Sequence, residues 1–242
     1  MMLPSLSLMF EHQGGLKLKF ILIMKYGNQK QADLSERNRI STMLKYESQL
    51  WTTGKKYIAG IDEAGRGPLA GPVVAAAVIF TQNIIIPGVN DSKKLSPVKR
   101  EMLYDLILEK ALAIGVGLSN EQLVDEINIL QATYRAMKEA IASLSIQPEH
   151  VLVDGKLISN FDLPQTAIVG GDGKCFSIAA ASIIAKVTRD RLMVEYDRQF
   201  PQYGFAQHKG YPTKQHIRAI IKHGLCPIHR TSFKIKNIES YE

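Results

Sequence analysis

The sequence has few cysteines and no long apolar run, and both absences narrow the class of protein. The 242-residue chain contains only Cys175 and Cys226, too few for a disulfide framework, so we expect a reducing compartment. No stretch approaches the roughly 20 apolar residues needed to span a bilayer. The N-terminus lacks a basic leader, which argues against a signal peptide. We therefore expect a cytoplasmic protein without a membrane partner.

Repeats, low-complexity linkers and a recognisable zinc motif are also missing. Four of the six histidines lie near the C-terminus, at His208, His216, His223 and His229. Their spacing matches no familiar zinc site, so we expect no metal at these histidines. We expect structural roles for Cys175 and Cys226. Without a linker, 242 residues are best accounted for by one substantial domain.

Negative charge is the scarcer sign, with 23 Asp and Glu against 30 Lys and Arg, which gives a net charge of +7. The excess is uneven, because residues 204–242 hold seven Lys or Arg and only two acids. A basic balance favours a polyanionic partner, nucleic acid before a membrane surface, although it is weak evidence alone.

The hydrophobic pattern predicts an α/β fold, a mixed β-sheet flanked by helices with a helical C-terminal part. Strands are predicted at 56–61, 72–80, 111–118, 150–153 and 165–169, and helices at 32–54, 97–107, 119–144, 177–197 and 212–223. The 119–144 helix is expected to break near Asn128. Gly115 and Gly117 inside a strand indicate close backbone approach. Residues 1–31 are expected to be a poorly ordered tail, 32–54 an N-terminal helix and 55–242 the main domain.

Carboxylates follow three of the predicted strands. Asp62 and Glu63 follow the first, Asp154 follows the fourth and Asp172 comes after the fifth. If these strands are neighbours, the acids converge at one edge of the sheet, and carboxylate oxygens are the ligands that Mg²⁺ and Mn²⁺ prefer. Asp154-Gly155 or Gly171-Asp172 alone is better explained as turn chemistry. Together the acids favour phosphoryl transfer, with two ions about 3.5–4 Å apart.

The Asp62-Glu63 pair poses a geometric difficulty. Adjacent residues on a regular strand face opposite sides of the sheet. A shared metal site therefore requires the chain to bend directly after Asp62. Gly65 and Gly67 would permit such a bend.

Eight residues are candidates for binding nucleic acid. They are Gly65, Arg66, Gly67, Lys93, Lys94, Lys186, Arg189 and Tyr211. The Gly65–Gly67 turn can bring bare backbone close to a ligand such as a 2′-hydroxyl, and Tyr211 can stack on a sugar or base. Lys186 and Asp190 are four residues apart and can pair, which leaves Arg189 to reach outward. An ordinary turn, a solvated loop and a packed tyrosine are the alternatives.

Six blocks resemble, in order, those of the bacterial ribonuclease HII family, the type 2 ribonucleases H. They are GIDEAGRGPLAGPVVAAAVI, NDSKKLSP, VDG at 153–155, GGDGKCFSIAAASIIAKVTRDRLM, HKGYPTKQH and GLCPIHRTSF. The blocks extend from about Lys56 to Phe233, so the resemblance covers most of the chain and makes 55–242 the catalytic domain. Residues 1–31 do not share it.

The resemblance implies a ribonuclease H-like fold with Asp62, Glu63, Asp154 and Asp172 as metal-binding catalytic acids. It implies that the Gly65–Gly67 turn reads a ribonucleotide at an RNA–DNA junction and that Tyr211 packs on the following deoxynucleotide. The expected reaction cuts 5′ to a ribonucleotide in duplex with Mg²⁺ or Mn²⁺, leaving a 3′-hydroxyl and a 5′-phosphate. The expected substrates are RNA–DNA hybrid and DNA duplex containing ribonucleotides, and we expect a monomer.

Three alternatives are weaker interpretations of the same residues. Ribonuclease HIII has a different sequence after its Asp-Glu pair and a larger N-terminal domain, whereas this chain has an intact Gly65-Arg66-Gly67. A non-catalytic nucleic-acid-binding module is favoured only if one of the acids is missing, and all are present. A DNA-specific nuclease of the same fold has no need to read a 2′-hydroxyl.

Overall fold

The computed structural model describes residue 31 and residues 33–234, in two units, residues 1–42 and 43–242. The predicted tail, except for Gln31, lies outside the described residues. In the first unit, Gln31 and residues 33–42 are helical. In the second unit, a turn at Leu44 precedes helix α2 (Lys45–Thr52), so the structure has two helical stretches where the sequence predicted one. Gly54, with φ of +88°, follows the end of α2.

The second unit contains a five-stranded mixed sheet in the order β3-β2-β1-β4-β5. Its strands are β1 (Ile58–Ala64), β2 (Val73–Ile79), β3 (Ala113–Ser119), β4 (His150–Asp154) and β5 (Gln165–Ile168). Strands β1, β2 and β3 pair antiparallel, whereas β1, β4 and β5 pair parallel. The predicted mixed sheet is confirmed, and the three strands followed by acids are neighbours.

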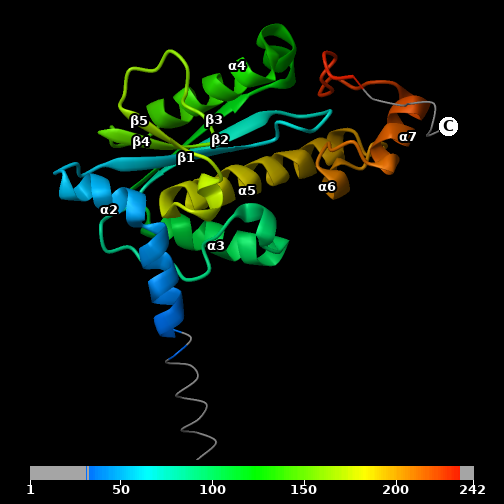
Figure 1. Cartoon of the computed structure of the whole chain (residues 1–242). Helices are drawn as coiled ribbons and strands as arrows, with labels where there is room; N and C mark the ends of the chain where they lie inside the picture. Colours follow the sequence, from blue (N-terminus) through cyan, green and yellow to red (C-terminus); the bar gives the residue numbers. More distant parts are fainter. Residues whose placement is uncertain (1–30, 32, 235–242) are drawn as a thin grey trace, which may run out of the picture. The chain divides into compact units, whose positions relative to one another are not determined.

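Helices cover both faces of this sheet (Figure 1). Helix α4 (Glu121–Ala142) lies on one face, and α5 (Phe176–Gln199) lies on the other, against β1 and β2. Helix α3 (Pro97–Lys110) packs against α5, and Ser96 caps it by accepting from the Lys99 amide. The short helices α6 (Phe205–His208) and α7 (Lys214–His223) form the helical C-terminal part. No helix in the described part of the chain is long and apolar enough to cross a bilayer.

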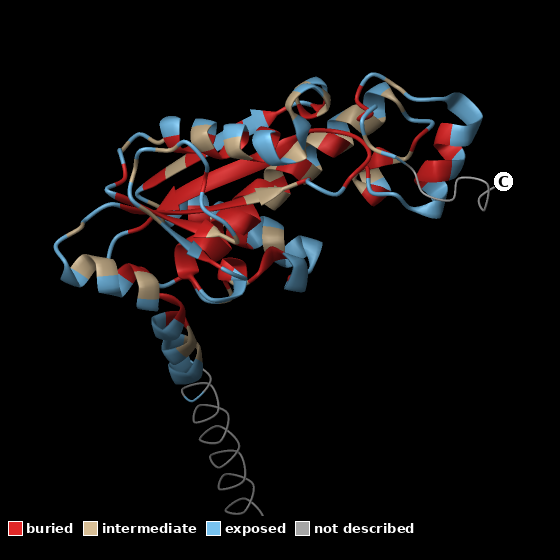
Figure 2. Ribbon diagram, turned by 45° about the horizontal axis from the view of Figure 1, so that its top comes forward, coloured by how far each residue is buried: buried red, intermediate tan, exposed pale blue. Residues whose placement is uncertain are grey.

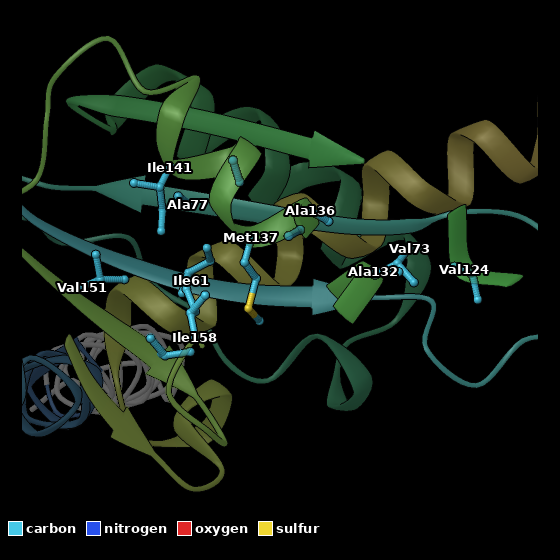
Figure 3. Close-up of a cluster of buried hydrophobic side chains, with 13 residues drawn as sticks. Ile61, Val73, Ala77, Val124, Ala132, Ala136, Met137, Ile141, Val151 and Ile158 are labelled. Atoms are coloured by element: carbon cyan, nitrogen blue, oxygen red, sulfur yellow. The ribbon is translucent and has the colours of Figure 1, made fainter. Parts of the chain in front are cut away.

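The interior is filled by small and branched apolar side chains, and β2 is buried along its whole length (Figure 2). The core between the sheet and α4 is shown in Figure 3. It consists of Ile61, Val73, Ala75, Ala77, Val124, Ala132, Ala136, Met137, Ala140, Ile141, Val151, Val153 and Ile158. Alternate residues of β1 and β2 therefore face α4, and the residues between them face α5.

Helix α4 is interrupted where the sequence predicted a break. Asn128 has φ of +68°, and its side-chain Oδ1 accepts hydrogen bonds from the amides of Leu130 (3.0 Å) and Gln131 (3.2 Å). The asparagine thus caps the second part of the helix, because its short polar side chain satisfies amides that have lost their helical partners.

Glycines let two helices approach the sheet closely. A Cβ at Gly115 or Gly117 of β3 would overlap the backbone carbonyls of Ala140 and Ala136 in α4. A Cβ at Gly60 of β1 would overlap the backbone of Ser177 at the start of α5. The close approach predicted for Gly115 and Gly117 is confirmed, and Gly60 provides the same contact on the opposite face.

We expect Gly117→Ala to lower the free energy of unfolding by about 2 kcal/mol, because backbone atoms of α4 would have to move to admit the methyl group. Urea denaturation measures this. Val116→Ala is the matched control, since Val116 is exposed on the opposite side of the same strand. Equal midpoints for the two variants would contradict the proposed packing constraint.

Candidate metal centre and nucleic-acid interface

Three carboxylates meet where the parallel strands end. Asp62 lies in β1, Asp154 ends β4, and Asp172 lies in the 3₁₀ turn η2 (Gly171–Gly173) that follows β5. One oxygen from each of the three lies within 4.8 Å of the others. Asp62 and Asp172 are buried, with exposed fractions of 4% and 8%. The convergence predicted from the strand ends is therefore present for these three acids.

The charges in this cluster are mutually unfavourable. Burial raises the pKa of the Asp62 carboxyl well above its usual range, and the charges of Glu63 and Asp154 raise it further. Burial also raises the pKa of Asp154, although its Oδ1 accepts a hydrogen bond from the Gly171 amide at 2.6 Å. A divalent cation would relieve this repulsion, and oxygen donors alone suit a hard cation. The residues present therefore fit Mg²⁺ or Mn²⁺.

Glu63 lies apart from the three-carboxylate cluster. Strand β1 continues to Ala64 in regular register, with Asp62 opposite Ala76 and Glu63 opposite Ala75. The bend that a metal site shared by Asp62 and Glu63 would require directly after Asp62 does not occur, because the ladder with β2 keeps the two acids on opposite faces. The Glu63 Oε1 accepts from Arg66 Nη1 at 3.2 Å. Burial is the main cause that raises its pKa, and the charge of Asp154 also contributes, so Glu63 remains within electrostatic range.

Lys93 and Lys94 lie beside the cluster, in a 3₁₀ turn, η1 (Ser92–Lys94), capped by Asp91. The Lys93 ammonium is 3.0 Å from Asp172 Oδ2, and most of its side chain is exposed. The Lys94 ammonium is 4.0 Å from Asp91 Oδ2 and is also exposed. Both ammonium groups are therefore exposed to solvent in the loop beside the carboxylates.

The loop after β1 is built on a buried arginine that the sequence analysis missed. Arg230 donates to the carbonyls of Gly65 (2.6 Å), Arg66 (3.1 Å), Pro68 (2.8 Å) and Gly71 (2.6 Å). A tight glycine-rich loop turns its carbonyls inward, and buried carbonyls need donors. One guanidinium with five donors satisfies four of them. The loop conformation is therefore fixed from inside the protein.

The prediction that Arg189 reaches outward is wrong. Its side chain is 1% exposed and donates to the carbonyls of Pro72 (2.9 Å), Ala70 (3.0 Å) and Lys209 (2.9 Å). Gly65, with φ of +98°, leaves room for this guanidinium. Arg189 thus joins the loop after β1 to the loop that carries Tyr211, because carbonyls of both loops share its donors.

Tyr211 lies next to the Gly65–Gly67 turn. A Cβ at Gly67 would be 3.7 Å from the Tyr211 ring, so the ring faces the glycine at van der Waals distance. The side chain is 41% exposed. Lys186 lies with its ammonium 6.0 Å from the ring centroid and 2.7 Å from Asp190 Oδ1, which is the pairing expected from their spacing. The Tyr211 ring and the backbone of Arg66 and Gly67 therefore form one exposed platform, whereas Gly65 is buried beneath it.

A groove of about 490 Å³ continues from this platform between α3, α5 and α6. Its lining includes four cations and two acids, namely Arg100, Lys186, Arg191, Lys209, Glu101 and Asp190. The Arg191 guanidinium pairs with Glu101 at 2.5 Å, and the Lys209 ammonium donates to the Ala206 carbonyl. The groove is thus a mildly basic surface that begins at Tyr211.

Three buried histidines support the loop that carries Tyr211. His216 Nδ1 lies 3.0 Å from the Tyr211 carbonyl and must donate to it, so His216 Nε2 accepts from His229 Nε2, 3.0 Å away. His229 Nδ1 in turn accepts from the Cys226 amide at 2.9 Å. The His208 ring stacks on His216, with centroids 4.4 Å apart. The rings of His216 and His229 are both neutral in this arrangement, because each donates from one nitrogen and accepts at the other.

The cysteines play structural roles in the described chain. Cys175 and Cys226 are both free thiols. Cys175 is fully buried, and burial raises the pKa of its thiol well above the usual value, which disfavours the nucleophilic thiolate. Cys226 lies against His229, with Sγ 3.1 Å from Nδ1. The histidine and cysteine groups form no metal cluster within the described residues.

The chain matches the family model described as Ribonuclease HII over residues 59–236. Ribonuclease HII of Bacillus cytotoxicus is 56% identical over 212 residues, which are 88% of this chain and 82% of that protein. Ribonuclease HII of Ruminiclostridium cellulolyticum is 53% identical over 226 residues, which are 93% of this chain and 88% of that protein.

Two solved structures show the same fold. The crystal structure of ribonuclease H2 from Pyrococcus horikoshii OT3 is 28% identical, with a TM-score of 0.64 over 76% of this chain and 96% of that one. A Bst ribonuclease HIII in complex with Mn²⁺ is 20% identical, with a TM-score of 0.53 over 70% of this chain and 63% of that one. The second likeness concerns the fold alone.

We expect the free energy of unfolding to fall as the pH is lowered from 6.5 towards 4. Burial lowers the pKa of His216 from 6.5 to about 4, and the neighbouring His208 and His229 add to this shift. The folded protein therefore disfavours the proton, so the contribution of His216 is complete above pH 6.5 and is lost as the pH falls to about 4. It amounts to about 3 kcal/mol.

Urea unfolding at several pH values measures this loss. His216→Asn should be less stable at pH 7.5 and should lose less stability on acidification. His223→Asn, at the exposed end of the same helix, is the matched control and should keep the wild-type pH dependence. The same slope in His216→Asn and wild type would contradict the assignment.

Proposed function

The chain belongs to the ribonuclease HII family, and it is therefore an endonuclease that acts on RNA–DNA hybrids; we propose that it cuts on the 5′ side of a ribonucleotide in duplex with the acids of the metal centre. The observation that carries this proposal is the meeting of Asp62, Asp154 and Asp172 oxygens within 4.8 Å, beside the Gly65–Gly67 turn. The finer assignments below rest on the geometry of these residues.

The three aspartates would hold Mg²⁺ or Mn²⁺, with two ions in the catalytic complex. Such ions would polarise the phosphoryl oxygens and lower the pKa of a water. The protein supplies the alignment. Asp62 is fixed by the β1–β2 ladder, and Asp154 and Asp172 are tied together through the Gly171 amide. These backbone constraints keep the carboxylates together despite their repulsion.

Glu63 and Lys93 approach the reacting phosphate from either side of the cluster. The Glu63 carboxylate lies on the other face of β1, next to Arg66, and its longer side chain can extend around the C-terminal end of this central strand. Lys93 places an ammonium at Asp172, where it balances carboxylate charge and can move to a phosphate oxygen. We assign Glu63 as the fourth catalytic and metal-binding acid, and Lys93 and Lys94 as phosphate contacts.

The ribonucleotide is read by the Gly65–Gly67 turn and its neighbour Tyr211. Arg230 and Arg189 hold the loop carbonyls inside, so the outer surface of the turn keeps a fixed shape. A 2′-hydroxyl both donates and accepts, which suits recognition by backbone groups. The Tyr211 ring, which faces Gly67, then packs on the next nucleotide, and the basic groove beyond it continues the path of the strand.

We expect the protein, with Mg²⁺ or Mn²⁺, to cut a labelled DNA duplex containing one ribonucleotide immediately 5′ of that residue, leaving a 3′-hydroxyl and a 5′-phosphate. An all-DNA duplex should stay intact, and EDTA should stop the reaction. Cleavage of long hybrid without cleavage at the single ribonucleotide would refute the role of the Gly65–Gly67 turn.

Asp154→Asn should lower cleavage more than roughly a hundredfold, because it removes charge from the metal site. Duplex binding, measured by fluorescence anisotropy with Ca²⁺, should persist because the cations remain. Asp162→Asn is the matched control, since Asp162 is exposed in the loop between β4 and β5. Wild-type turnover by Asp154→Asn would refute the metal assignment.

Tyr211→Ala should reduce the preference for a single ribonucleotide over long hybrid about tenfold, because a base–aromatic stack contributes about 1–3 kcal/mol. General duplex affinity should change less. Tyr57→Ala removes a tyrosine of similar exposure, 37%, at the start of β1 and serves as control. An equal loss on both substrates would show that Tyr211 contributes affinity without selectivity.

A further inference from the structure

A buried glutamate on α2 contacts the start of α5. Glu47 is 2% exposed, and its Oε1 accepts hydrogen bonds from the Ser177 amide (2.8 Å), the Ser177 hydroxyl (2.7 Å) and the Cys175 thiol (3.1 Å). These partners are about 130 residues away in the chain. Burying a carboxylate is unfavourable unless donors compensate. Three donors converge on Oε1, whereas the buried Oε2 has no hydrogen-bond partner among the described residues.

Glu47 acts as the N-terminal cap of α5. The residue at the N-cap position, Cys175, makes no side-chain cap hydrogen bond of its own. A helix start needs acceptors for its first amides, and a negative charge there also interacts favourably with the helix dipole. Glu47 supplies both from a different helix. Glu47 of α2 thus accepts the hydrogen bond that the side chain of a local N-cap residue would ordinarily accept.

The start of α5 is joined directly to Asp172. The turn η2 that carries Asp172 ends at Gly173, two residues before Cys175. The amides of Lys174 and Cys175 donate to the Gly171 carbonyl at 3.0 and 2.8 Å, and the Gly171 amide donates to Asp154. These hydrogen bonds and the short chain connection link the start of α5 to both aspartates, so we expect a displacement of the helix start to move Asp172 and Asp154.

The opposite side of this helix start is already fixed. Gly60 lies against the Ser177 backbone, two residues before Asp62 in β1. Tyr46, Leu50 and Trp51 of α2 pack against a cluster formed by Ile58, Leu152, Ile168, Cys175 and Ile178. The α5 start is therefore held between β1 and α2, and Glu47 is the polar contact on the α2 side.

We propose that Glu47 is a positioning residue for the metal centre, which it orders by capping α5 and thereby fixing the turn that carries Asp172. The inference rests on the proposed metal site. It makes α2 part of the catalytic scaffold, although no residue of α2 contributes an oxygen to the cluster. Loss of the Glu47 cap should therefore weaken metal binding more than it weakens the binding of substrate.

Mn²⁺ affinity, measured by calorimetry on the full-length protein without substrate, tests this. Glu47→Ala should raise the Mn²⁺ Kd roughly tenfold, a typical effect of residues that orient metal ligands. Glu47→Gln keeps one acceptor but loses the charge, so its Kd should rise about threefold. Gln49→Ala, exposed on the same helix, should bind as wild type. Hydrogen exchange should show a faster Ser177 amide in Glu47→Ala.

A metal-specific effect also predicts that saturating Mn²⁺ restores turnover in the Glu47 variants, which a general loss of structure would not allow. If Glu47→Ala does not fold, as judged by circular dichroism, Glu47→Gln decides. Kd values of the folded Glu47 variants within twofold of wild type would overturn the inference. Asp172→Asn separates the two proposals. If this variant binds Mn²⁺ with the same Kd as the wild type, the metal site itself is refuted.

Discussion

The close contact between the start of α5 and strand β1 is the constraint on which the rest of the site depends. Gly60 allows the helix backbone to lie directly on the strand, so that Asp62 and the turn before α5 occupy the same small region. Any side chain at this position would separate the strand from the helix. The spacing of the carboxylates is thus set by backbone packing rather than by the acids, which repel one another.

Buried polar side chains fix the loops and the helix start that surround this packing contact. Arg230 and Arg189 donate to the inward carbonyls of the loop after β1, and Glu47 accepts from the Ser177 amide at the start of α5. The pair His216 and His229 supports the loop of Tyr211. Each satisfies backbone groups that would otherwise be buried without partners. The exposed groups of the site are few, and a larger set of hidden ones keeps them in place.

The sequence was sufficient to predict the sheet, because its strands are short segments of mostly apolar residues and three of them, β1, β4 and β5, end at or just before acids or glycines. It also predicted the break at Asn128 and the convergence of Asp62, Asp154 and Asp172, since both follow from local chemistry and strand order. It did not predict that Glu63 lies on the opposite face of β1 from Asp62, apart from the other three acids. Whether a strand bends depends on the register with β2, which is a property of the pair and not of one segment.

The buried cations show the same limit. Arg189 and Lys186 lie three residues apart on α5, yet the arginine is enclosed and the lysine reaches the surface. Their different environments come from the loops that pass over α5. The sequence did contain a signal for Arg230 and Arg189, namely the glycine-rich segment after β1. Such a segment can turn several carbonyls inward, and an arginine elsewhere in the chain has enough donors to bind them.

The partners of Arg230 have a consequence for the order of biosynthesis. Arg230 stands 159 to 165 residues after the loop carbonyls to which it donates. A ribosome-bound chain that has already released β1, β4 and α5 still lacks this donor. The Gly65–Gly67 turn, which we propose reads the ribonucleotide, therefore acquires its internal support only after Arg230 has left the ribosome, later than the strands and turns that carry the acids of the metal centre.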